Sequence, residues 1–158
     1  DIWNITALVV SVLSVLLSLY ALRQATTKNT SDMYLFFISQ YAKEDMKLAL
    51  RKLKDIKRGV YRLEQWESDM KNNLPKAFEY DEARRLVKYF YDTLAYMKLE
   101  KLIEARFVRL ICLKKGAWLY LDTVEAMEKF FDSGYDKKPY AVIRDVCENL
   151  RKEGCCPP

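Results

Sequence analysis

The sequence predicts an all-α protein with one N-terminal transmembrane helix followed by a cytoplasmic bundle of five or six helices. Three observations favour this fold class. The first 22 residues contain no Lys or Arg, although the chain of 158 residues has 27 of them. Only four Gly and four Pro interrupt the chain, and so few turn signals favour long helices. Alternation of apolar and polar residues is not sustained over any stretch, so strands are not predicted.

The N-terminal apolar run covers residues 2–22, which are 21 consecutive residues with Tyr20 as the only ionisable group. A helix of this length measures about 31 Å, close to the thickness of the hydrocarbon core of a bilayer. Trp3 and Tyr20 lie where aromatic belts are found, and Arg23 closes the run. A signal peptide would have basic residues before its apolar core, and a buried helix is rarely so uniformly apolar. We therefore predict a transmembrane anchor over residues 1–25.

The orientation of this anchor follows from the distribution of charge. The net charge of +5 is the sum of −1 from the first 22 residues, which contain Asp1, and +6 from the rest. By the positive-inside rule, the C-terminal domain is expected in the cytoplasm. The predicted parts are the anchor, a juxtamembrane connection over residues 26–31, a helical domain over 32–152 and a flexible tail over 153–158.

Small residues form a stripe along the predicted anchor. Their spacings of 4, 3, 4, 3 and 4 place them on one side of a helix: Ala7, Ser11, Ser14, Ser18, Ala21 and Ala25. Within lipid, small residues allow close approach of helices and hydroxyls can bond across the interface. We predict that this small-residue stripe packs against other transmembrane helices, in a membrane protein complex or by self-association. The alternative is that the hydroxyls bond to carbonyls one turn earlier and the residues are merely tolerated.

Apolar residues at helical spacing predict the helices of the domain. They are expected at about residues 32–41, 43–58, 81–102, 104–114, from 118 or 122 to 132, and from 139 onward, with a short helix and a connection within 60–80. The long helix is expected to begin at Asp81 and to bury one face: Ala83, Leu86, Val87, Phe90, Leu94 and Met97. Lys114, Lys115 and Gly116 form a stop signal for the helix before them.

The helix at 43–58 also carries a basic face. Seven basic and three acidic residues give this segment a local charge of +4, and the basic residues recur at spacings of 4, 4, 3 and 4: Lys43, Lys47, Arg51, Lys54 and Arg58. Such a face near a membrane is suited to anionic headgroups of the lipid bilayer. The alternative is an ordinary solvated face. Nucleic acid is not a predicted partner, because no recognition motif is present.

The chain is not predicted to be an enzyme. It has no His, which removes the commonest general base and the imidazole metal ligand. Its glycines are isolated, so neither a dinucleotide fingerprint nor a phosphate-binding loop can be written. No catalytic residue, cofactor, metal site or small-molecule substrate is predicted.

The four cysteines fall into two groups. Cys112 and Cys147 lie among apolar residues and are predicted to be small core residues. Cys155 and Cys156 could bind a metal with Cys147, become lipidated or pair with another chain. Their spacing matches no strong zinc pattern, so an inert tail is predicted.

Two segments carry a family resemblance. With the N-terminal run before them, KEDMKLALRKL (43–53) and DEARRLVKYFYDTL (81–94) resemble prokaryotic membrane-anchored helical proteins of unknown function. This resemblance implies architecture and topology rather than an activity, and the chain departs from it at 97–102, where a tight glycine turn would be expected. The predicted function is a single-pass accessory or scaffolding subunit that docks onto a larger membrane protein complex. The alternative is a regulatory module that binds anionic lipid through its basic helix.

Overall fold

The computed structural model describes the backbone of residues 2–131 and 134–155 and, within the first helix, the side chains of 14–22, 24 and 31–42. All regular structure in this part of the chain is helical, which confirms the all-α prediction. The elements are α1 (Ile2–Ala42), α2 (Glu44–Lys57), α3 (Leu63–Lys71), α4 (Pro75–Leu99), α5 (Ala105–Cys112), α6 (Lys115–Leu119), the π-helical segment η1 (Tyr120–Val124), α7 (Glu125–Phe131) and α8 (Lys138–Lys152).

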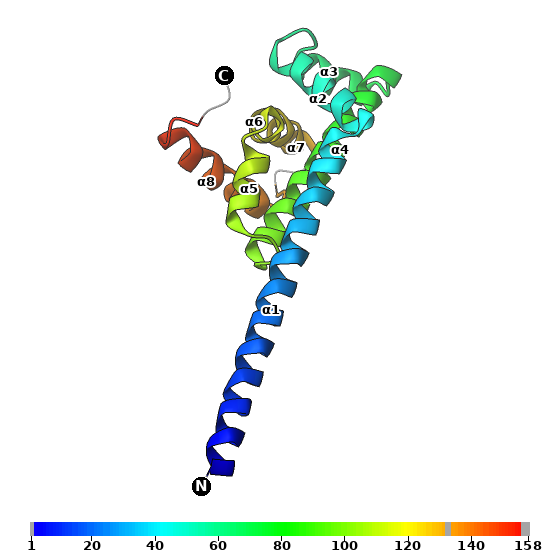
Figure 1. Cartoon of the computed structure of the whole chain (residues 1–158). Coiled ribbons are helices and arrows are strands. Elements are labelled where there is room, and N and C mark those ends of the chain that lie inside the picture. Colours follow the sequence, from blue (N-terminus) through cyan, green and yellow to red (C-terminus); the bar gives the residue numbers. More distant parts are fainter. Residues whose placement is uncertain (1, 132–133, 156–158) are drawn as a thin grey trace.

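Helix α1 extends far out of the domain that the other helices form (Figure 1). It has 41 residues, or about 62 Å at 1.5 Å per residue. Its backbone remains helical through residues 26–31, where the sequence predicted a connection, and through 32–41, where it predicted a separate helix. The physical reason is that no Gly or Pro precedes Gly59, so nothing in this stretch breaks the helix.

The predicted transmembrane span is wrong. Among the described residues, no helix has both the length and the apolar character that crossing a membrane requires. The charge-free stretch whose side chains are described is 14–22; nine residues of helix measure about 14 Å, whereas the hydrocarbon core is about 30 Å thick. The side chains of 2–13, on which the prediction also depended, lie outside the described residues. The orientation and the cytoplasmic location were derived from that span, and both stay predictions.

The core of the domain is built around α4. Its inner face is buried as predicted at Val87, Phe90 and Leu94, and each such side chain contributes about 1.5–3 kcal/mol of hydrophobic stabilisation. Leu86, by contrast, is partly exposed. Helix α4 begins at Pro75 rather than Asp81, because proline suits the first turn of a helix and does not end it.

Helix α4 ends without glycine. Lys101 adopts a left-handed conformation with φ of 57°, and the Leu102 N–H donates to the Met97 carbonyl oxygen at 2.9 Å. Lysine thus occupies the position after the helix that glycine usually fills in this capping motif. The turn that the family resemblance led us to expect is present, but a non-glycine residue makes it.

Gly116 does not stop a helix; it lies buried within α6. A Cβ atom at this position would lie 2.7 Å from Tyr91 Oη and 3.0 Å from Tyr41. The Gly116 N–H donates to Tyr41 Oη at 3.2 Å. The glycine therefore allows α6 to approach the end of α1, and the preceding helix ends earlier than predicted, at Cys112.

Candidate docking site along helix α1

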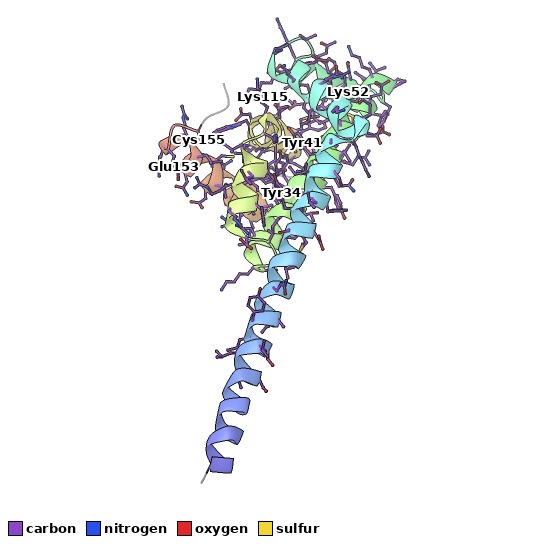
Figure 2. All side chains as sticks on the ribbon, viewed as in Figure 1. Tyr34, Tyr41, Lys52, Lys115, Glu153 and Cys155 are labelled. Carbon is purple, nitrogen blue, oxygen red and sulfur yellow. The ribbon has the colours of Figure 1, made fainter. Side chains whose placement is uncertain are left out.

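One face of α1 attaches the helix to the domain. Phe37 is buried, with its ring centroid 5.3 Å from that of Phe90 on α4. Tyr34 stacks on Phe107 of α5 at 4.8 Å. Figure 2 shows Tyr34 and Tyr41 where α1 meets the domain. These contacts fix which side of α1 faces inward.

Before it reaches the domain, α1 exposes apolar side chains in every direction. Among the described side chains of this part, six large ones are each more than half exposed: Val15, Leu16, Leu17, Leu19, Tyr20 and Leu22. A helix that is apolar on all sides is normally covered by other structure. A contiguous exposed apolar patch of this kind is typical of an interaction site.

The structure describes half of the small-residue stripe. Ser14, Ser18 and Ala21 are exposed, whereas the side chains of Ala7, Ser11 and Ala25 lie outside the described residues. Ser18 Oγ donates to the Ser14 carbonyl oxygen at 2.9 Å, as the alternative interpretation of the stripe expects. Because this hydroxyl already has an acceptor, Ser18 can be covered by another chain without losing a hydrogen bond.

A groove lies where α1 meets α2 and α4. Its cavity volume is about 290 Å³, and we call it the α1–α4 groove; its lining residues are Phe36, Phe37, Gln40, Lys43, Asp45, Met46, Leu86, Tyr89, Phe90 and Thr93. Three apolar side chains on its walls are exposed: Phe36 (56%), Leu86 (39%) and Tyr89 (74%). Its lining contains one basic and one acidic side chain, Lys43 and Asp45, so the groove has no net charge.

The groove and the small-residue stripe lie on one side of α1. Ser18 and Phe36 are 18 residues apart, which is five full turns at 3.6 residues per turn. Phe37, the next residue, points into the domain instead. We call the surface formed by Ser14, Ser18, Phe36, Leu86 and Tyr89 the docking face; between Ser18 and Phe36, the side chains of 23 and 25–30 lie outside the described residues.

The sequence did not predict the α1–α4 groove. Leu86 was assigned to the core because its spacing fits the inner face of α4, and Tyr89 was not singled out. The available signal was weak: apolar residues in the predicted helix at 32–41 were too numerous for one buried face. Only the packing of α1 on α4 decides which of them stay exposed.

The predicted basic face is exposed along α2. All five side chains lie outside the core: Lys43, Lys47, Arg51, Lys54 and Arg58. Glu44 lies 3.4 Å from Lys47 and 3.7 Å from Arg51. These are exposed ion pairs of small energetic weight, so the face keeps a positive charge.

A cluster of charges is buried between α4 and α7. Arg84 is bound to Asp81 at 2.8 Å and contacts Glu128, and all three residues are buried. Arg85 is exposed, and its guanidinium lies 2.7 Å from the same Asp81 carboxylate. The sequence placed Asp81 at a helix start, whereas the structure makes it the counter-ion of a buried arginine. Because the opposite charges compensate one another, this cluster has a structural role.

Tyrosines gather around η1. Tyr120 donates to Asp92 at 2.5 Å, and its ring stacks on that of Tyr140 at 4.4 Å. Burial raises the pKa of Tyr120, and its hydrogen bond to Asp92 raises it further. Burial also raises the pKa of Tyr140, whose hydroxyl has no hydrogen-bond partner among the described residues. π-helical segments are frequent at functional sites, but the rings of Tyr120 and Tyr140 pack together here and both are fully buried.

Cys112 and Cys147 are buried free thiols, as predicted. Their mutual hydrogen bond and burial raise the pKa of the Cys112 thiol. Cys155 is exposed, and Cys156 lies outside the described residues. In the part of the chain that the structure describes, no three His, Cys, Asp or Glu side chains form a group able to hold a metal ion.

Comparison with known proteins provides no relative. No family model matches the chain, and neither a curated protein nor a solved structure matches it. The resemblance to membrane-anchored helical proteins therefore stays a prediction.

Proposed function

We propose that this chain is an accessory or scaffolding component that docks onto another protein through the docking face. The single observation that supports the proposal is that α1 projects from the domain with large apolar side chains exposed along it. Removing apolar surface from water contributes about 25 cal/mol per Å². A bound partner is the simplest way for this surface to gain that stabilisation.

Co-purification of the full chain tests the proposal. Ser14→Leu with Ser18→Leu adds bulk to the described part of the stripe and should abolish recovery of the associated protein. Ser68→Leu is the matched control, because Ser68 is exposed on α3, away from the docking face. The proposal fails if both variants retain the same associated proteins in the same amounts as the wild type.

A second candidate function is binding to an anionic lipid surface through the basic face. The observation that favours it is the exposure of all five basic side chains on one side of α2. Each Lys or Arg near an anionic membrane surface contributes about 1 kcal/mol, and salt screens the attraction.

Vesicle sedimentation separates this second candidate from the first. Lys54→Glu with Arg58→Glu should abolish salt-sensitive binding of the full chain to vesicles that contain phosphatidylserine. Arg151→Glu with Lys152→Glu changes the net charge equally at the exposed end of α8 and should leave binding intact. Equal losses in both variants, or binding that salt does not change, would eliminate this candidate.

A further inference from the structure

We infer that the surface for anionic lipid is built from two elements, because Lys114 and Lys115 at the start of α6 extend the basic face of α2. This inference rests on the second candidate function, and it adds two residues that the sequence did not assign to lipid binding. The ligand is the surface of a bilayer that contains anionic lipids. We call the combined surface the extended basic patch; it consists of Lys43, Lys47, Arg51, Lys54, Arg58, Lys114 and Lys115.

Two contacts attach α6 and η1 to opposite ends of α2. Near the start of α2, the Gly116 N–H donates to Tyr41 Oη at 3.2 Å, and Lys115 directly precedes Gly116. At the end of α2, Lys57 Nζ lies 2.5 Å from a carboxylate oxygen of Asp122 on η1. The segment from Lys115 to Asp122 therefore runs beside α2.

Both contacts lie on the flank of α2 that adjoins its basic face. Lys57 follows Lys54 by three residues and directly precedes Arg58, and residues three apart are neighbours on a helix surface. At the other end, Lys43 follows Tyr41 by two residues. Side chains at the start of α6 therefore continue the basic face of α2.

The two lysines at the start of α6 are available to a ligand. Lys114 and Lys115 are both exposed, whereas Gly116 and Ala117, which follow them, are buried. Neither ammonium group forms an ion pair within the described part of the chain. Burial of the following residues fixes the backbone of this turn, so the two charges are held beside α2.

The extended basic patch carries a large excess of positive charge. Next to its seven basic side chains lies one exposed carboxylate, that of Glu44, which pairs with Lys47 and Arg51. Asp45 lines the α1–α4 groove, on another side of α2. The attraction to an anionic surface grows with each Lys or Arg that lies near it, so the lysines of α6 strengthen the binding that α2 alone would provide.

The chemistry of the patch favours a bilayer over a nucleic acid. Five of its seven side chains are lysines, whose compact charges suit many headgroups without a fixed geometry, whereas arginine is preferred for directed contacts to phosphate. Helix α2 contains no aromatic residue, and Trp118 of α6 is half-buried. The patch therefore lacks the exposed rings on which the bases of a single strand stack.

Vesicle sedimentation of the full chain tests the inference. With vesicles of phosphatidylcholine and phosphatidylserine, Lys114→Glu with Lys115→Glu should weaken binding by at least about tenfold. Arg151→Glu with Lys152→Glu changes the net charge equally at the exposed end of α8 and should leave binding unchanged. Equal losses in these two variants, or no loss in the first, would overturn the inference.

A milder variant keeps the test independent of folding. Lys114→Gln with Lys115→Gln removes the two charges without reversing them and should weaken binding in the same direction by a smaller factor. Its thermal unfolding should match that of the wild type, because both positions are exposed. Unchanged vesicle binding by this folded variant would overturn the inference.

Two comparisons of ligands test the choice of a bilayer. Vesicles of phosphatidylcholine alone should bind much more weakly than the mixed vesicles, and equal binding would show that the apolar part of α1 rather than charge drives the association. A DNA duplex should also bind more weakly than the mixed vesicles at the same salt concentration. Tighter binding to DNA would overturn the assignment to lipid.

Failure of this inference is distinguishable from failure of the second candidate function. If Lys54→Glu with Arg58→Glu abolishes binding to the mixed vesicles and Lys114→Glu with Lys115→Glu does not, lipid binding stands and its extension onto α6 is excluded. If the wild type does not bind these vesicles, both are excluded.

Discussion

Replacing Gly116 by alanine tests how α1 is fixed to the domain. The new Cβ would lie 2.7 Å from Tyr91 Oη, which is 0.7 Å short of the 3.4 Å at which ordinary contact begins. Tyr91 is fully buried and cannot withdraw easily. Overpacking of this kind costs about 1–3 kcal/mol.

Whether Gly116→Ala lowers the unfolding free energy depends also on the higher helix propensity of alanine. Alanine is favoured over glycine in a helix by about 1 kcal/mol, so the net loss of unfolding free energy for Gly116→Ala should be about 0–2 kcal/mol. In a chain of this size each kcal/mol lowers the melting temperature by about 2–4 °C. Urea and thermal unfolding followed by circular dichroism would measure the loss.

A double-mutant cycle identifies the cause. The Tyr91 hydroxyl is buried without a hydrogen-bond partner among the described residues, so Tyr91→Phe should be neutral or should stabilise by about 1 kcal/mol. In that background Gly116→Ala should cost less, by about 1 kcal/mol, since the closest atom is gone. The reasoning is refuted if Gly116→Ala costs the same in both backgrounds.

Three further predictions concern the stability of the domain. Arg84→Met should lower the unfolding free energy by about 3–5 kcal/mol because it leaves buried carboxylates uncompensated. Arg85→Met removes an exposed partner of the same Asp81 and should cost at most about 1 kcal/mol. Equal losses of unfolding free energy in urea would contradict the structure. Lys101→Gly should stabilise by about 1 kcal/mol, since the left-handed conformation costs an L residue about that much, and an unchanged urea midpoint would show that the turn is not strained. Burial and the hydrogen bond to Glu125 raise the pKa of Tyr135 to about 12, so the Tyr135 hydroxyl loses its proton at a lower pH in the unfolded chain than in the folded one. The resulting stabilisation is complete below pH about 10 and is lost as the pH rises toward 12. An unfolding free energy that stays constant between pH 9 and 12 in urea titrations would disprove this.

Local patterns were sufficient to predict the helical class and much of the core. The spacing of Val87, Phe90 and Leu94 predicted the buried face of α4, and all three are buried. Such predictions succeed because a single helix carries the whole signal. The start of α4 was misjudged because an acidic residue was interpreted as a cap, when it pairs with an arginine inside the fold.

The candidate site was harder to predict because it is built from distant parts of the chain. Phe36, Met46 and Tyr89 line one groove, yet they come from three helices whose packing no local pattern specifies. The extent of α1 was underestimated for a different reason. Polar residues at 26–31 favour a turn, but without glycine or proline they do not force one.

The accessibility of Tyr89 in the natively purified full chain tests most directly whether the docking face is an interface. Hydroxyl-radical footprinting should find this side chain protected in the wild type, although it is 74% exposed in the single chain. Ser14→Leu with Ser18→Leu should restore its labelling, and Ser68→Leu should not. Rapid labelling of Tyr89 in the wild type, at the rate found in the double variant, would contradict the claim that this face is an interface.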